Sequence, residues 1–219
     1  GDYPLAVVQI DHTPLDIVLV DDEYRLPMAR PWITLGVDIY SRMVTGYYIS
    51  FEKPSALTVG MCLSNSILPK DKLLAEFNID ASWPCWGVPR TVHADNAREF
   101  RGNMLKKASA EYGFQIEWRP VGRPHFGAHV ERLLGTFAKR IHELPGTTFS
   151  NIQQRQDYDS DKKSALTLKE FEEWFLRRAA DEILAETNER TKNIAGIFID
   201  RRKAEAGPPV GKAIQVELS

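Results

Sequence analysis

Short apolar runs separated by turns divide the first fifty residues into predicted β-strands. The first run covers residues 6–11 and continues at 15–20 after Pro14, which cannot donate a backbone hydrogen bond and so marks an edge or a bulge. Two further runs, 32–40 and 43–50, are rich in β-branched and aromatic side chains. Residues 21–30 are polar and predict a loop. The pattern predicts a meander of three antiparallel strands.

Helical and strand patterns alternate farther along the chain. Residues 55–68 have the apolar spacing of a helix that packs on a sheet, and Ser55 is a suitable N-cap. Short strands are predicted at 91–94 and 114–118, with a helix at 103–112 between them. The order strand, helix, strand favours parallel pairing through a right-handed crossover.

The most regular helical pattern lies at residues 126–144. Its apolar side chains recur at helical spacing and form one stripe: Val130, Leu133, Leu134, Phe137, Ala138 and Ile141. Glu131 flanks this stripe, so it is predicted where the packed face meets solvent. Thr167 and Glu170 have the spacing of a capping box, which predicts another helix from there to about residue 188.

Composition limits the class of protein. The chain has 219 residues, of which 43% are hydrophobic, and this suits one domain, or one domain with a fragment of the next. The net charge of −2 gives no overall basic character, so affinity for DNA would come from local patches, bound metal or other domains. Cys62 and Cys85 lack metal-ligand spacing and are predicted to be buried thiols. No apolar run is long enough to span a membrane, and a chain that begins at Gly1 is interpreted as an excised piece of a longer protein.

Three acidic residues far apart in the sequence lie at or near the ends of predicted elements. Asp11 ends the first apolar segment, Asp95 follows a short strand, and Glu131 lies early in the most regular helix. Singly, Asp11 is explained by bonds to backbone amides and Glu131 by the helix dipole. Together they predict a site for hard divalent cations, which take carboxylate oxygens. Asp38, just before Ser41, is interpreted as a turn residue instead.

Four segments together resemble the catalytic core of the superfamily of retroviral integrases and DDE transposases, and most of all the TnsB/TniA-type (Mu-like) transposases. These segments are QIDHTPLD, TLGVDIYSRMVTGYYIS, VHADNAREF and RPHFGAHVERLLGTF. The resemblance covers about residues 5–195 and includes the 35 residues between the second and third acids. It implies an α/β, ribonuclease-H-like fold: a five-stranded mixed sheet with strands 1–3 antiparallel, flanked by helices. Residues 1–195 would form this core, and 196–219 a linker towards a further domain.

The resemblance also implies a chemistry. Asp11, Asp95 and Glu131 match the family's metal-binding catalytic acids, which would hold two Mg²⁺ or Mn²⁺ ions and carry out 3′-end cleavage and strand transfer of transposon DNA into target DNA. Many family members have glycine where this chain has Ala97 and Ala128, and alanine would be strained there only if φ were positive. The alternatives are a ribonuclease-H-like nuclease that only hydrolyses, and a catalytically silent DNA-binding or assembly module.

The partners implied are double-stranded DNA (transposon ends and target), further copies of the protein on that DNA, and a transposon-encoded ATPase that selects targets. The expected location is the prokaryotic cytoplasm, at the nucleoid. Basic side chains near the acids are candidate phosphate contacts, although an ordinary solvated helix surface explains them about as well. These candidates are Arg119, Arg123, His125, His129, Arg132 and Lys139.

Overall fold

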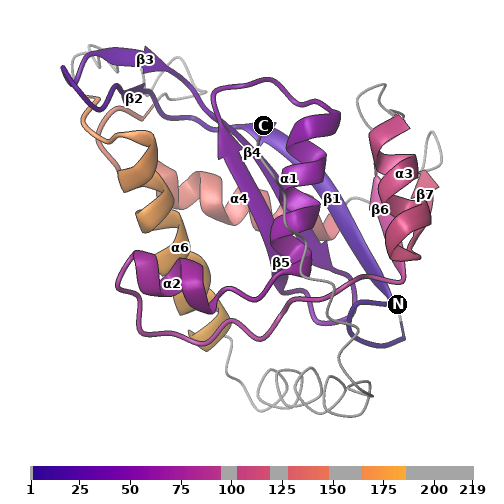
Figure 1. Ribbon diagram of the computed structural model, residues 1–219. Coiled ribbons are helices and arrows are strands. Elements are labelled where there is room, and N and C mark those ends of the chain that lie inside the picture. The colour runs from indigo at the N-terminus through magenta and orange to yellow at the C-terminus, as the bar shows by residue number, and fades with distance from the viewer. Residues whose placement is uncertain (1, 95–102, 119–127, 148–163, 186–219) are drawn as a thin grey trace.

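A five-stranded mixed sheet forms the centre of the computed structural model (Figure 1). The structure describes residues 2–94, 103–118, 128–147 and 164–185. The strand order is β5-β4-β1-β6-β7, so the first strand in the sequence lies in the middle of the sheet. Among these residues, no helix is both long enough and apolar enough to cross a membrane.

The predicted strand pairings are present. β1 (Val7–Pro14) is antiparallel to β4 (Trp32–Asp38), which is antiparallel to β5 (Val44–Ser50). On its other side, β1 is parallel to β6 (Thr91–Ala94), and β6 is parallel to β7 (Gln115–Trp118). The expected α/β, ribonuclease-H-like architecture is therefore confirmed, with its three antiparallel strands followed by a parallel half.

A second, two-stranded sheet was not predicted. β2 (Leu19–Val20) pairs with β3 (Pro27–Ala29), which lies in the segment interpreted from its polarity as a loop. The predicted strand at 15–20 is correspondingly shorter in the structure. Long-range contacts explain the difference, because Val20 donates its N–H to the carbonyl of Leu166, which is far away in the sequence.

One face of the main sheet is covered by α1 (Ala56–Ile67) and α3 (Asn103–Tyr112). Ser55 caps α1 as predicted, since its side chain accepts the N–H of Thr58. The buried cluster under these helices includes Val8 and Ile10 of β1, both fully buried. Even-numbered residues of β1 therefore face α1 and α3.

The opposite face is covered by α4 (Ala128–Ile141) and α6 (Leu168–Ala185), as Figure 1 shows. Their buried cluster includes Leu35 of β4 together with Val130 and Phe175 of the helices. The capping box predicted for α6 is present, because the Thr167 hydroxyl accepts the N–H of Glu170 while the Glu170 carboxylate accepts the N–H of Thr167. A further short helix, α2 (Asp71–Glu76), was not predicted.

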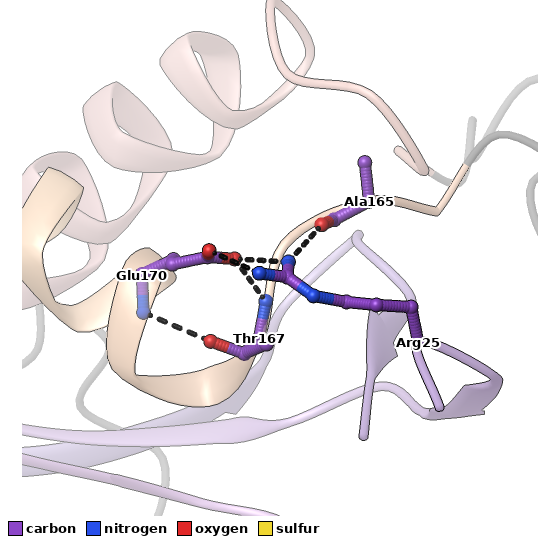
Figure 2. A network of polar contacts seen from close by, with 4 residues as sticks. All are labelled: Arg25, Ala165, Thr167 and Glu170. Carbon is purple, nitrogen blue, oxygen red and sulfur yellow. Dashed lines mark hydrogen bonds and ion pairs between the residues drawn. The ribbon is translucent and has the colours of Figure 1, made fainter. Parts of the chain in front are cut away.

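A polar network joins the β2–β3 hairpin to the start of α6 (Figure 2). The Arg25 guanidinium donates to both carboxylate oxygens of Glu170, each at 2.7 Å, and also to the carbonyl of Ala165 at 3.0 Å. Arg25 has a φ of 57°, an unfavourable value for a residue with a side chain. Glu170 therefore stabilises both the helix start and the hairpin tip.

The two cysteines have the predicted character. Cys62 and Cys85 are both free thiols and both fully buried. Burial raises the pKa of the Cys62 thiol to about 12, because the thiolate would lose its hydration.

Candidate active site

Asp11 lies in the middle strand of the sheet, on the face that α4 covers. Its position follows from strand alternation: Ile10 faces α1, so Asp11 faces the opposite side, where it lies across from Leu35 of β4. Asp11 is half-buried, and one carboxylate oxygen accepts the N–H of His12 at 2.9 Å. The sequence predicted this acid at the end of a strand, but β1 continues to Pro14, so Asp11 lies within the strand, half-buried at the helix-covered face.

Glu131 lies in the first turn of α4, on the same side of the sheet. Val130, Phe137 and Ile141 are buried and fix this helix, which contacts β1 and β4. Glu131 itself is exposed, one residue from the fully buried Val130. The structure therefore brings the first and third predicted acids to one face of the sheet, and it places Glu131 at the edge of the packed stripe, as the sequence predicted.

Asp95, the second predicted acid, lies outside the described residues, as does Ala97. The strand before it is described: Ala94 is fully buried in the cluster under α1 and α3, and His93 pairs with Gln9 of β1. Within the described ranges, no three His, Cys, Asp or Glu side chains gather into a set that could hold a metal ion. The convergence of all three acids therefore remains a prediction.

One polar pair beside this region was not identified from the sequence. His93 Nε2 and Glu117 Oε2 lie 2.6 Å apart on the paired strands β6 and β7. Because His93 is also paired with Gln9, strand alternation places the pair on the face that carries Asp11. The sequence offers one signal for this pair, which is that both residues occupy odd-numbered positions in short predicted strands. To use that signal one must know the pairing register of β6 and β7, which only the structure gives.

Asp38 has the structural role expected from the sequence. Its side chain accepts hydrogen bonds from the N–H of Leu5 at 2.9 Å, the N–H of Ser41 at 2.8 Å and the Ser41 hydroxyl at 2.6 Å. Asp38 is fully buried, and this burial raises the pKa of its carboxyl group, while the bonds from Ser41 and Leu5 oppose the rise. Both oxygens are committed to the turn, which explains why this acid is unsuited to a metal.

The predicted DNA contacts divide into two groups. Arg132 and Lys139 are exposed on α4. The backbone of His129 is part of α4, and its side chain lies outside the described structure, as do three whole residues: Arg119, Arg123 and His125. Ala128 is the first residue of α4, so its backbone is helical, and alanine in place of the family's glycine causes no strain there.

The sequence matches known transposition proteins over most of its length. A family described as the TnsB C-terminal domain matches residues 9–146. The transposase for transposon Tn552 of Staphylococcus aureus is 26% identical over 189 residues, and the match covers 78% of this chain and 37% of that protein. Transposon Tn7 transposition protein TnsB of Escherichia coli is 30% identical over 180 residues, covering 80% of this chain and 26% of that protein. The chain thus spans well under half the length of either relative.

Solved structures with similar coordinates include two integrase cores. The catalytic core domain of BIV integrase has a TM-score of 0.41 and 15% identity, covering 74% of this chain and 78% of that one. The HTLV-2 integrase catalytic core domain in complex with magnesium has a TM-score of 0.42 and 16% identity, covering 65% of this chain and 74% of that one.

Proposed function

Because this chain belongs to the family of TnsB C-terminal domains, we propose that it is the catalytic core of a transposase. In this proposal the core cleaves the 3′ ends of transposon DNA and joins them to target DNA, with Asp11, Asp95 and Glu131 as ligands of two divalent metal ions. The observation that carries the proposal is the placement of Asp11 and Glu131 on one face of the sheet, although 119 residues lie between them in the sequence.

The register of β1 and β6 supports the inclusion of Asp95. Gln9 pairs with His93 in a parallel ladder. β6 ends at Ala94, so Asp95 follows directly in the sequence after the strand that lies beside β1. A site built in this way takes one ligand from each of two neighbouring strands and a third from the helix above them.

The donor set fits a hard cation. Three carboxylates offer only oxygen atoms, which suit Mg²⁺ or Mn²⁺. Half-burial of Asp11 at the edge of a packed core would hold its carboxylate in place, while the exposed Glu131 faces the side from which DNA can approach. Two such ions, when bound, activate an attacking oxygen and stabilise a leaving one. The chain's own part is to hold the three carboxylates and to orient the DNA backbone against them.

The proposed partners follow from the family and remain proposals. Transposon-end and target DNA would be bound by several copies of the protein, and a transposon-encoded ATPase would select the target. Arg132 and Lys139, both exposed on α4 with Glu131, are the described candidates for phosphate contacts. Since the overall charge of the chain is −2, such local cations would have to supply the attraction.

Replacement of Asp95 by Asn tests the proposal. The amide keeps the shape of the side chain but removes the charge that holds a cation, so Mg²⁺-dependent strand joining by the full-length protein should be lost while binding to transposon-end DNA is retained. Unchanged joining by Asp95→Asn would remove this residue from the site. A DNA end pre-cut to expose its 3′-hydroxyl separates the alternatives, because a simple nuclease would hydrolyse it without joining, and a silent module would only bind it.

A further inference from the structure

Gly135 lies on the exposed side of α4, where no described residue packs against it. A side-chain carbon added at this position would have no heavy atom of the described residues within 4 Å, and the φ of this residue is not positive. Gly46 provides the contrast, since a carbon added there would lie 2.2 Å from the Ser66 hydroxyl oxygen of α1. Glycine within a helix is less stable than alanine. Internal packing therefore explains Gly46 but not Gly135.

The neighbours of Gly135 on the helix surface are one acid and two cations. Glu131 is one turn earlier and Lys139 one turn later, and Arg132 lies beside them; all three are exposed. No described residue forms an ion pair with Arg132 or Lys139. By contrast, the guanidinium of Arg140, the next residue on the helix, lies 3.3 Å from a carboxylate oxygen of Glu143. Two cations thus border the bare backbone at Gly135.

The residue after Gly135 has a partner within the helix. Thr136 is also exposed, and its hydroxyl donates to the carbonyl of Arg132 at 3.1 Å. Threonine and glycine are both weaker helix formers than alanine. Thr136 is thus engaged within α4 itself, which makes it a matched control for the exposed Gly135.

We propose that the DNA strand held at the acids passes directly over Gly135, and that the missing side chain lets its sugar–phosphate backbone approach the helix closely. This inference rests on the proposed function. Gly135 lies about 6 Å along the helix axis from Glu131, given a rise of about 1.5 Å per residue. Lys139 and Arg132 attract the phosphates, and Gly135 sets how near they come. Gly135 is thus a positioning residue.

The test compares two substitutions one residue apart. Gly135→Ala and Thr136→Ala both improve helix propensity, so each should raise the thermal unfolding midpoint, Gly135→Ala by about 2 °C. Only Gly135→Ala places a methyl group in the path of the DNA. We expect it to weaken binding of a pre-cut transposon-end duplex, measured by fluorescence anisotropy, by about tenfold, and to slow strand joining, while Thr136→Ala binds and joins as the unsubstituted protein does.

The outcomes separate this inference from the proposed function. If the unsubstituted protein binds and joins DNA and Gly135→Ala does so equally well, the inference is wrong and the proposed function stands. If Gly135→Ala weakens DNA binding but no metal-dependent joining is found for the unsubstituted protein, the proposed function is wrong and α4 remains a DNA surface. A loss of binding in Thr136→Ala as large as that in Gly135→Ala would also overturn the inference. The loss would then come from a general change in the helix and not from a methyl group that fills the space above Gly135.

Discussion

Two aspartates on neighbouring strands show how position in the sheet decides the role of a carboxylate. Asp38 ends β4 and pairs with Val8 near the start of β1, whereas Asp11 lies three residues farther along β1. Asp38 is fully buried and accepts three hydrogen bonds from Leu5 and Ser41. Asp11 is half-buried and lies beneath the helix that carries Glu131. One acid completes a turn, and the other remains accessible to solvent and to a cation.

The difference has a simple physical basis. A carboxylate whose oxygens are surrounded by the donors of its own turn contributes to the fold, and metal binding would break those bonds. A carboxylate at the edge of a core keeps some hydration, so exchange of water for a metal ion costs less. The comparison teaches that burial distinguishes a structural acid from a candidate ligand better than residue type does.

The largest expected effect is on activity and concerns Asp11. Asp11→Asn should reduce Mg²⁺-dependent strand joining at least about a thousandfold, since loss of a metal ligand removes several kcal/mol of transition-state stabilisation. The free energy of unfolding, measured in urea without metal, should change by less than about 0.5 kcal/mol. If Asp11→Asn unfolds at a much lower urea concentration than the unsubstituted protein, then Asp11, like Asp38, is a structural acid and the prediction is wrong.

The next effect is on stability and concerns Asp38. Asp38→Ala leaves two N–H groups and one hydroxyl without their acceptor in a buried turn, so we expect a loss of about 3 kcal/mol in the free energy of unfolding. Urea titration monitored by tryptophan fluorescence would measure it. Ser41→Ala is the matched control, because it removes one donor and leaves the Asp38 carboxylate with the others. If Asp38→Ala unfolds at the same urea concentration as the unsubstituted protein, then Asp38 does not stabilise the fold and does not differ from Asp11 in this respect.

A third carboxylate, that of Glu170, is fully engaged yet partly exposed, and so lies between the two. Its bidentate contact with Arg25 should contribute about 1 kcal/mol, because solvent screens surface ion pairs. A double-mutant cycle with Arg25→Ala and Glu170→Ala isolates this coupling. A coupling energy near zero would show that the hairpin tip is held by other contacts, such as the bond from Arg25 to Ala165.

The smallest effect is the pH dependence of this contact. The Arg25 guanidinium, followed by the N–H of Thr167, lowers the pKa of Glu170 from 4.5 to about 2. Because the folded pKa is lower than the unfolded one, the stabilisation is complete above about pH 4.5 and is lost as the pH falls towards 2. Exposure limits the loss to less than about 1 kcal/mol. Glu170→Gln should remove this part of the acid sensitivity, as measured by urea unfolding between pH 5 and pH 2.5.

Elements with a strong local pattern were predictable. The stripe of α4, the Ser55 cap and the Thr167 capping box are each formed by residues that are close to one another in sequence, so local spacing specifies them. β3 was missed because Pro27, Met28 and Ala29 are exposed and have no core-facing alternation. The partner of Arg25 was not predictable either, since Glu170 is 145 residues away.

The amino-acid sequence by itself determined the strands of the main sheet and the main helices, because hydrophobic periodicity and end signals are local properties, and it predicted three acids as a site. Only the tertiary structure decided which face Asp11 and Glu131 occupy. Asp11 and Glu131 share a face because β1 lies in the middle of the sheet and α4 packs across it, and Asp38 is excluded because Leu5 and Ser41 surround it. Such relations depend on strand order and register, which arise when distant apolar segments are buried together.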